Sequence, residues 1–578
     1  MSLTSALHAT YAGISVAESK ISVVSSNITN AEKPGYTVKR YQTEYSTANG
    51  IMIPISGTIK GNLNADLYEG VIESNTEYRY SLTIANYLEQ YVDTVGTTGG
   101  SDSLSSHMNR LETAVSELET TPSDTSAKVA VVSAAQSVAR ELRALSGTVQ
   151  GLRLDADQAI EESAETFNTL LENLDDLNRQ VMILTTTNSS TADVEDQRMA
   201  VLEELSQYLD VTYYINDSNQ LKVFTTDGST LLDSNTHPVS FTAATSVTSQ
   251  NVYPADFSPL VINGVDVTTR TDTGIFGALI ELRDRILVEE QEKLDEFTNT
   301  LSRTINTEFN KGSSYPPRNI LTSDMEALTG AEAFAANGFV RVAVVDEGGL
   351  VQQYADLDLS TYATVNDVVA ALNGIAGMSA SINVNGEIEM IADNADEGVA
   401  MNQMDSIVGP DSQTFGMYFG FNSIFTGEGS EYIRICDYLK TSSEALPGGT
   451  LIDDPVLVIG DLGIMAGDAS IATAMLGVLD GLVAFNAAGD FSAQNATLSK
   501  YANKIIATLA NATQDATRES ETTRILYEEL RTTMANETGV NIDEETAKMV
   551  ELENQYEASA TVLSTILKMF DTLIAAMN

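Results

Sequence analysis

The chain has 578 residues, 43% of them hydrophobic, so it is long enough for several buried cores and we expect three or four domains. Its 81 acidic and 31 basic residues give a formal charge of −50, which repels nucleic acids and anionic membranes rather than gathering them. A single cysteine, Cys436, excludes an intramolecular disulfide framework and a structural zinc site built from several thiolates.

The N-terminal segment carries the pattern of a packing helix. Apolar or small residues recur at alternating steps of four and three, at Leu3, Leu7, Thr10, Ile14, Ala17, Ile21, Val24 and Ile28. This spacing places one narrow apolar seam along a helix and predicts lengthwise packing on another helix. Pro34 and Gly35 end the pattern, and we interpret the Thr-, Asn- and Gly-rich stretch up to about residue 75 as irregular.

Long helical patterns follow over about 76–95, 103–120, 124–149, 152–185 and 192–209. A small β element is predicted near 211–270, because Val211, Tyr213 and Ile215 alternate and a turn signal comes next. The helical pattern then returns over 274–310.

A change of composition at Tyr315-Pro316-Pro317 marks a boundary. Residues 315–449 are predicted to be β-rich with one helix near 365–372. Alternating strands flank Asn385-Gly386, a pair typical of two-residue hairpin turns because both positions tolerate φ > 0. Helical patterns resume over 471–485 and 498–533, so we interpret the β-rich part as a domain inserted into a helical rod.

The C-terminal segment repeats the N-terminal rhythm, with Met549, Leu552, Tyr556, Ser559, Leu563, Ile566, Phe570, Leu573 and Met577 on one line. Each terminal helix is about 40 Å long and has too narrow a seam to bury itself alone. We therefore expect the two ends to meet, and residues 1–40 and 540–578 to be poorly ordered in the free chain and to fold on assembly. The predicted assembly interface is Leu3, Leu7, Ile14, Ile21, Val24, Ile28, Met549, Leu552, Tyr556, Leu563, Ile566, Phe570 and Leu573.

The predicted fold is mainly α with a β-rich inserted domain. An inner domain of paired, coiled-coil-like terminal helices comprises residues 1–45 and 536–578. A rod of antiparallel helices comprises 46–314 and 450–535, and the outer β-rich domain is 315–449. The N-terminus lacks the pattern of a cleaved signal peptide, and Asp480, Lys568 and Asp571 interrupt the longest apolar stretches, so we expect no membrane span.

Several strings resemble the flagellar axial proteins, the rod, hook and filament subunits of bacteria. Ser26-Asn27-Ile28-Thr29-Asn30 followed by Gly35-Tyr36 is similar to a signature shared by rod, hook and hook-associated subunits. Residues 538–545 and 553–560 are similar to the end of the hook-associated protein 1 family, where a Ser usually stands at the position of Thr538. The residues that carry the family motif are Asn27, Asn30, Gly35, Tyr36, Gly539, Asn541 and Glu545.

Internal strings resemble the same family at 195–206, 274–310 and 467–476, so that the resemblance covers roughly residues 1–45, 76–315 and 460–578. The chain departs from the family at 70–80, where a basic residue and an Asp–aromatic pair are usual.

The resemblance implies a structural subunit at the junction between hook and filament, exported by the flagellar type III apparatus and polymerised outside the cell. It also implies the partners: further copies of the chain in a ring, the hook protein, the second junction protein, and an export chaperone at the C-terminal helix. It implies no nucleic acid, cofactor or metal ion.

Three alternatives remain open. The seams can form the core of a coiled-coil hairpin inside one molecule, because their spacing does not distinguish intramolecular from intermolecular packing. Another axial subunit, such as a hook protein, the second junction protein or a flagellin, has similar termini. The β-rich insert can be a surface binding or adhesive module that the rod only supports.

Enzyme activity finds little support in the sequence. His8, His107 and His237 are far apart, and no metalloprotease, phosphate-loop or nucleophile-elbow motif is found, so we predict that the chain is not an enzyme. The acidic run 543–545 is predicted to lie in the first turn of the last helix, where carboxylates complement the helix dipole.

Overall fold

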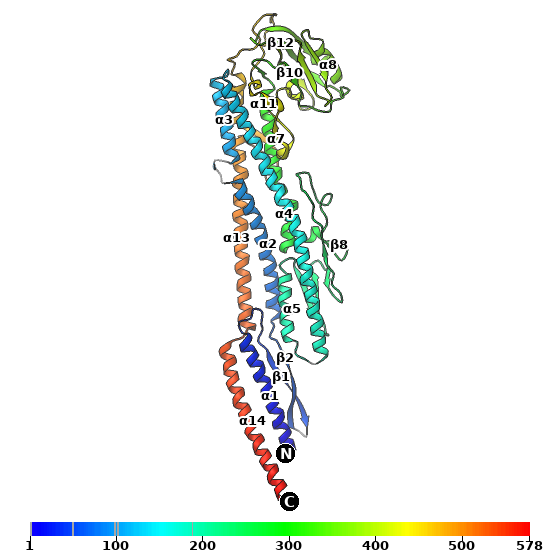
Figure 1. Ribbon diagram of the computed structural model, residues 1–578, viewed down its shortest axis with the longest axis vertical. Coiled ribbons are helices and arrows are strands. Elements are labelled where there is room, and N and C mark those ends of the chain that lie inside the picture. Colours follow the sequence, from blue (N-terminus) through cyan, green and yellow to red (C-terminus); the bar gives the residue numbers. More distant parts are fainter. Residues whose placement is uncertain (1–2, 49–50, 97–99, 101–102, 188, 578) are drawn as a thin grey trace.

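The computed structural model describes residues 3–48, 51–96, 100, 103–187 and 189–577. The molecule is elongated and mainly helical, with a β-rich part at one end and both termini at the other (Figure 1), which confirms the predicted fold class. Its longer helices are α1 Leu3–Asn30, α2 Ala65–Val95, α3 Leu104–Thr120, α4 Thr125–Thr186, α5 Ala192–Leu205, α6 Gly274–Glu281, α7 Leu287–Phe309, α8 Val365–Asn373, α12 Ser470–Asp480, α13 Leu498–Thr538 and α14 Ile542–Met577. Short helices are α9 Phe415–Phe419, α10 Gly429–Tyr432 and α11 Asp437–Thr441.

The strands are short outside the hairpin and the insert. The first eleven are β1 Arg40–Ala48, β2 Ile51–Lys60, β3 Val211–Ile215, β4 Leu221–Thr225, β5 Thr230–Leu232, β6 Val239–Ser240, β7 Val261–Ile262, β8 Val265–Asp266, β9 Ser313–Ser314, β10 Ile320–Thr322 and β11 Ala336–Asn337. The remaining ones are β12 Phe339–Asp346, β13 Val351–Asp358, β14 Met378–Ile382, β15 Ile388–Ala392, β16 Glu397–Asn402, β17 Ile407–Val408, β18 Phe425–Thr426, β19 Arg434–Ile435, β20 Pro447–Gly449, β21 Val483–Phe485 and β22 Gln494–Ala496.

The rod is built from long helices that pack along one another (Figure 1). α2 packs on α13, and α4 packs on α3, α5 and α7, around one continuous apolar core. Asp124 caps α4 as predicted, because its carboxylate accepts a hydrogen bond from the backbone N–H of Ser126. The prediction of two helices over 124–149 and 152–185 is wrong, since α4 runs unbroken for 62 residues through Gly147 and Gly151. Burial of its apolar face outweighs the low helix propensity of glycine there.

Residues 40–48 and 51–60 form an antiparallel hairpin, which corrects the interpretation of this stretch as irregular. In β1 the exposed Gln42 and Glu44 alternate with the half-buried Tyr41 and Thr43, so little of the strand is apolar and the ribbon was not recognised. The hairpin lies against α1. α2 then begins at Ala65, earlier than predicted, where the Asn64 side chain caps the helix.

The middle of the chain contains the predicted β element and a bent helix. Two three-stranded sheets, β3–β4–β5 and β6–β7–β8, lie beside the rod, and a π-helical turn at Leu282–Ile286 joins α6 to α7. Gly274 opens α6 at φ +64°, where an added Cβ would lie 2.5 Å from the carbonyl oxygen of Tyr208. Only glycine fits this approach of two backbones.

The insert has its own core. The sheets β13–β12–β16 and β10–β15–β14 pack with α8 around a cluster that includes Val342, Leu372 and Phe419. The predicted hairpin is β14–β15, but its turn differs from the prediction. Ile382 pairs with Ile388, and Gly386 at φ +77° follows a turn closed by its own N–H donating to the carbonyl of Asn383. The loop is therefore longer than the predicted two residues, because Gly386 forms a bulge after a four-residue turn.

The packing bears on the domain limits. Residues in 424–446, such as Phe425 and Leu439, belong to the core of the rod, whereas Leu451, Leu457 and Ile464 pack on the insert. The helical pattern predicted over 471–485 ends at Asp480, and β21 follows. We therefore propose a terminal domain of about 1–60 and 540–578, and an insert formed by about 315–421 and 451–464.

Candidate functional site

The two chain ends form an antiparallel pair of helices beyond the end of the rod (Figure 1). α1 and α14 pack along their length, each presenting its predicted seam to the other. Val24, Leu552 and Ile566 are buried in this contact. The other predicted interface residues are half-buried, namely Leu3, Leu7, Ile14, Ile21, Ile28, Met549, Tyr556, Leu563 and Phe570, except that Leu573 is 55% exposed.

This arrangement differs from the expectation of poorly ordered tails in a single chain. Both helices are formed, and the seam of α14 covers the seam of α1 within one molecule. The two seams fit together because their residues have the same spacing. The sequence left intramolecular and intermolecular packing open, and the structure shows the intramolecular pair.

The pair leaves much apolar surface uncovered. Two lines flank the seam of α14: Val562, Met569 and Leu573 on one side, and Leu567 and Ile574 on the other, all between 48% and 56% exposed. A layer of two helices covers only one face of each, so these flanks have no cover within the described part of the chain. Exposed apolar residues in such lines mark a surface for association.

Asn27 is the polar centre of the terminal domain. Its side chain is fully buried and meets both the hairpin and α14. The amide Nδ2 donates to the carbonyl oxygen of Lys39 (2.9 Å) and to Oε2 of Glu545 (2.8 Å). Its Oδ1 accepts from the backbone N–H of Lys39 (3.0 Å) and from the hydroxyl of Tyr36 (3.1 Å). Asn27 thus uses both halves of its amide to hold three segments together.

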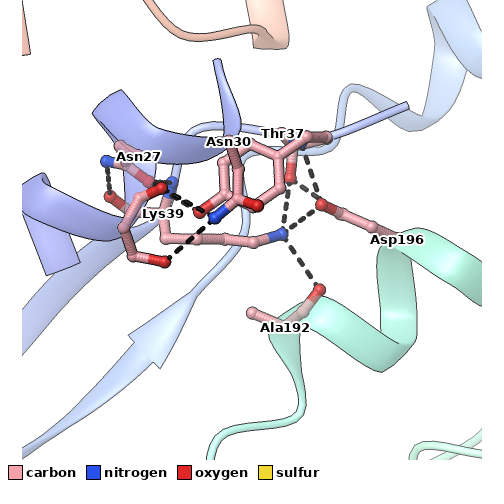
Figure 2. A network of polar contacts seen from close by, with 8 residues as sticks. Asn27, Asn30, Thr37, Lys39, Ala192 and Asp196 are labelled. Carbon is pink, nitrogen blue, oxygen red and sulfur yellow. Dashed lines mark hydrogen bonds and ion pairs between the residues drawn. The ribbon is translucent and has the colours of Figure 1, made fainter. Parts of the chain in front are cut away.

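Lys39 continues this network into the rod, as Figure 2 shows. Its ammonium group forms an ion pair with Asp196 in α5 and donates to the carbonyl of Ala192 (3.0 Å) and to the hydroxyl of Thr37 (3.1 Å). Asp196 also accepts from the backbone N–H of Thr37 (2.9 Å) and from its hydroxyl (2.8 Å). Burial raises the pKa of Asp196, and the contacts with Lys39 and Thr37 oppose that rise.

The remaining motif residues shape the joint between the terminal domain and the rod. Asn30 donates to the carbonyl of Ser26 in its own helix (2.9 Å), and Gly35 takes φ +75° in the loop that follows. Beside them a cavity of about 280 Å³ is lined by residues of α2, α5 and α13 as well as by the loop. Desolvation raises the pKa of Tyr36, which lies on this loop.

On the C-terminal side, Gly539 and Asn541 connect α13 to α14. An added Cβ at Gly539 would lie 2.3 Å from the carbonyl oxygen of Ala535, so no larger residue fits this connection without a shift. The Asn541 side chain accepts from the backbone N–H groups of Asp543 (3.0 Å) and Glu544 (3.3 Å) and so caps α14. Glu545 is buried, and its second oxygen accepts from Lys548 (2.7 Å).

Sequence reasoning missed Lys39, Thr37 and Asp196 as parts of the joint. Asp196 stands in a string that was noted, but its partner lies 157 residues away and nothing periodic connects the two. The signal available was a lysine and a threonine directly after the Gly35-Tyr36 turn, which is too common a pattern to be diagnostic.

Metal and membrane features complete the description. Among the described residues, no group of three or more His, Cys, Asp or Glu side chains is placed to hold a metal ion.

One helical run, Leu498–Ala576, contains an 18-residue window of mean hydropathy 1.3, long and apolar enough to cross a membrane by length and composition. We expected charged residues to exclude such a window, and this expectation is wrong. A window with up to two charged residues can still reach this mean hydropathy. It is weak evidence for a span, since helices that pack on protein partners meet the same criterion.

Comparison with known proteins identifies the family. The family described as "Flagellar hook-associated protein FlgK helical domain" matches residues 88–316, and "Flagellar basal body rod FlgEFG protein C-terminal" matches 532–576. Flagellar hook-associated protein 1 of Escherichia coli K12 is 24% identical over 99% of this chain and 100% of its own length. The proteins of that name from Salmonella typhimurium and Bacillus subtilis 168 are each 22% identical, over 99% and 66% of this chain and 100% and 81% of their own lengths. Over its whole length the chain matches the flagellar hook-associated protein 1 family.

A solved structure has the same fold. The flagellar hook junction protein FlgK from Burkholderia pseudomallei superposes with a TM-score of 0.51 at 14% identity, covering 80% of this chain and 99% of that one. The sequence matches over the full length of the chain make it a structural component of the flagellum, an external appendage.

The strings that resembled the hook-associated protein 1 family have structural roles in the rod. Arg198 is buried and donates to the Asn178 side chain (3.2 Å) and to the carbonyl of Asn219 (2.9 Å), which joins α4, α5 and the β3–β4 turn. Arg283 is fully buried at the π-helical turn and pairs with Asp157 (2.6 Å) and Asp284 (2.7 Å). These contacts stiffen the rod that carries the terminal domain.

Proposed function

We propose that this chain joins the flagellar hook to the filament and polymerises through its terminal helices. The observation that carries this proposal is the α1–α14 pair, which extends beyond the rod and keeps two apolar flanks exposed. Burying one Leu- or Ile-sized side chain is worth roughly 1.5–3 kcal/mol, so several such contacts per subunit drive association. No catalytic step is needed for this role.

The partners follow from a position at a junction. Copies of the chain pack laterally in a ring, with the hook protein on one side and the second junction protein on the other. The chain leaves the cell through the flagellar type III apparatus. An export chaperone covers the flanks of α14 before assembly, because a helix that exposes Leu567 and Ile574 is prone to aggregate in the cell.

Deletion of the gene in its own organism tests the junction role. Electron microscopy of the deletion strain should show hooks without filaments, and flagellin should appear as monomer in the medium. The intact gene, supplied on a plasmid, should restore filaments. Filaments of normal number and length on the deletion strain would refute the junction role.

The insert is a candidate for a second role, as a surface binding module. It lies at the end of the molecule opposite the termini (Figure 1), and its segment 451–464 exposes Val456 by 75% and Ile459 by 60%. The double variant Val456→Asp, Ile459→Asp should keep filaments and swimming but lose adhesion of the cells to the surface they colonise. Unchanged adhesion, with filaments intact, would leave the insert without this role.

A further inference from the structure

The outer face of the β1–β2 hairpin carries two positive charges that have no counterpart in their own molecule. Arg40 and Lys60 are directly paired across the two strands, and both are exposed. No carboxylate among the described residues forms an ion pair with either of them, although the chain has 81 acidic residues. Like charges opposite each other in a ribbon are unfavourable, so an acidic partner would relieve a local cost.

The rest of this face is polar. Gln42 and Glu44 follow Arg40 on the exposed side of β1, and they pair with Thr58 and Ser56 of β2. Glu44 is the one carboxylate on the described part of this face, and it accepts a hydrogen bond from the Ser56 hydroxyl (3.2 Å). The positive charge is therefore concentrated at the end of the ribbon that lies next to the joint.

One flank of α14 carries the complementary charge. Glu553 and Glu557 lie one turn apart, are exposed, and have no ion-pair partner in the part of the chain that the structure describes. Farther from the joint, the same flank carries Leu567, Asp571 and Ile574. Lys568 borders this flank, whose net charge stays negative.

The spacings match as well as the charges. Residues directly opposite in an antiparallel ribbon have Cβ atoms about 5 Å apart, and residues four apart on a helix about 6 Å.

The two surfaces are not neighbours within one molecule. α1 packs on both the hairpin and α14 and lies between them, and both run from the joint toward the far end (Figure 1). Two copies with parallel long axes can therefore place the hairpin of one on the α14 of the next. A contact between two different surfaces repeats from copy to copy and so generates a ring or a helical array.

We propose that the outer face of the β1–β2 hairpin docks on the Glu553–Glu557 flank of α14 of a neighbouring copy. Arg40 and Lys60 pair with Glu553 and Glu557. This inference rests on the proposed function, because it specifies the lateral contact between subunits. Each copy then contacts one neighbour through its hairpin and another neighbour through α14.

Charge reversal tests the contact in cells that carry the gene in place of the wild type. Arg40→Glu with Lys60→Glu, and separately Glu553→Lys with Glu557→Lys, should each reduce the fraction of cells with filaments by about tenfold or more, because like charges then face each other. All four changes together should restore filaments. Lys500→Glu and Glu172→Lys, at exposed rod positions, serve as matched controls and should leave filaments normal.

A cysteine pair keeps the test informative if a reversed variant fails to fold. Arg40→Cys with Glu557→Cys should give disulfide-linked ladders from isolated flagella after mild oxidation, whereas each single variant should give none beyond the wild type. The native Cys436 is buried and does not compete. Normal filaments with either reversed pair, no restoration by the fourfold variant, or no ladder would each overturn the contact. Failure of the proposed contact does not refute the junction role as long as deletion of the gene abolishes filaments. The junction role is refuted only if the deletion strain still forms filaments.

Discussion

Asn27 and Glu545 are separated by 518 positions in the chain, yet the amide of the first donates to the carboxylate of the second at 2.8 Å. The contact is buried, and it joins the helix that starts the chain to the helix that ends it. Through the backbone of Lys39, the same asparagine holds the hairpin, and the Lys39 side chain holds the rod.

Replacing Asn27 with alanine should loosen the terminal pair. The change leaves the backbone groups of Lys39 and one oxygen of Glu545 without their partner, at a cost of about 1–3 kcal/mol. Amide hydrogen exchange in α1 and α14 of the full chain should accelerate accordingly, while exchange in α4 stays the same. Asn30→Ala is the matched control, because the hydrogen bonds that the structure shows for the Asn30 side chain go to Ser26 in its own helix. Equal effects of the two variants would contradict this role of Asn27.

Asp196→Ala should separate the terminal domain from the rod. It removes the partner of a lysine whose side chain is only 3% exposed, and an orphaned buried charge costs about 3–5 kcal/mol. Limited proteolysis should then cut within 31–39 at a lower protease concentration than in the wild type. Asp193→Ala, one turn earlier and exposed, should not change the cleavage pattern.

Substitutions at two neighbouring residues of α14 should distinguish an effect on folding from an effect on assembly. Ile566 is 7% exposed and faces α1, so Ile566→Asp places a carboxylate in the seam and destabilises the pair by about 3 kcal/mol or more. Leu567 is 48% exposed, so Leu567→Asp should leave the exchange rates of the free chain unchanged and still block incorporation into flagella. Normal flagella with Ile566→Asp would count heavily against the assignment of the seam.

Buried tyrosines should make the rod sensitive to alkaline pH. Burial raises the pKa of Tyr68, at 2% exposure, and of Tyr91, at 0%, well above 10. Above about pH 10 the unfolded chain releases these protons and the folded chain keeps them, so stability is full below pH 10 and falls as the pH rises. Part of the tyrosinate absorbance should therefore appear together with the loss of helical circular dichroism. Tyr68→Phe should make the fall of the melting temperature with pH less steep.

The sequence predicted the terminal helices well because their seams keep one spacing over eight and nine positions. It did not predict the joint, since the pairing of Lys39 with Asp196 depends on a contact between segments 157 residues apart. The hairpin at 40–60 was missed for a local reason. Its exposed face is polar, and only half of each strand carries the residues that pack on α1.

The limits of the insert illustrate a second kind of miss. Tyr315-Pro316-Pro317 correctly marked a change of composition, but the chain returns to the core of the rod at Phe425 and leaves it again at Leu451. Short segments that pass from one core to the other do not differ in composition from the segments around them. Only the packing shows to which core they belong.

The pairing of α1 with α14 also sets a condition on when a subunit becomes competent. A chain that passes end-first through a narrow channel cannot complete this pair until the 36 residues of α14 and the first helix are on the same side. A prematurely terminated chain emerges with the seam of α1 open and with Asn27 facing no carboxylate. The first and last helices can therefore pair only after the whole polypeptide has arrived.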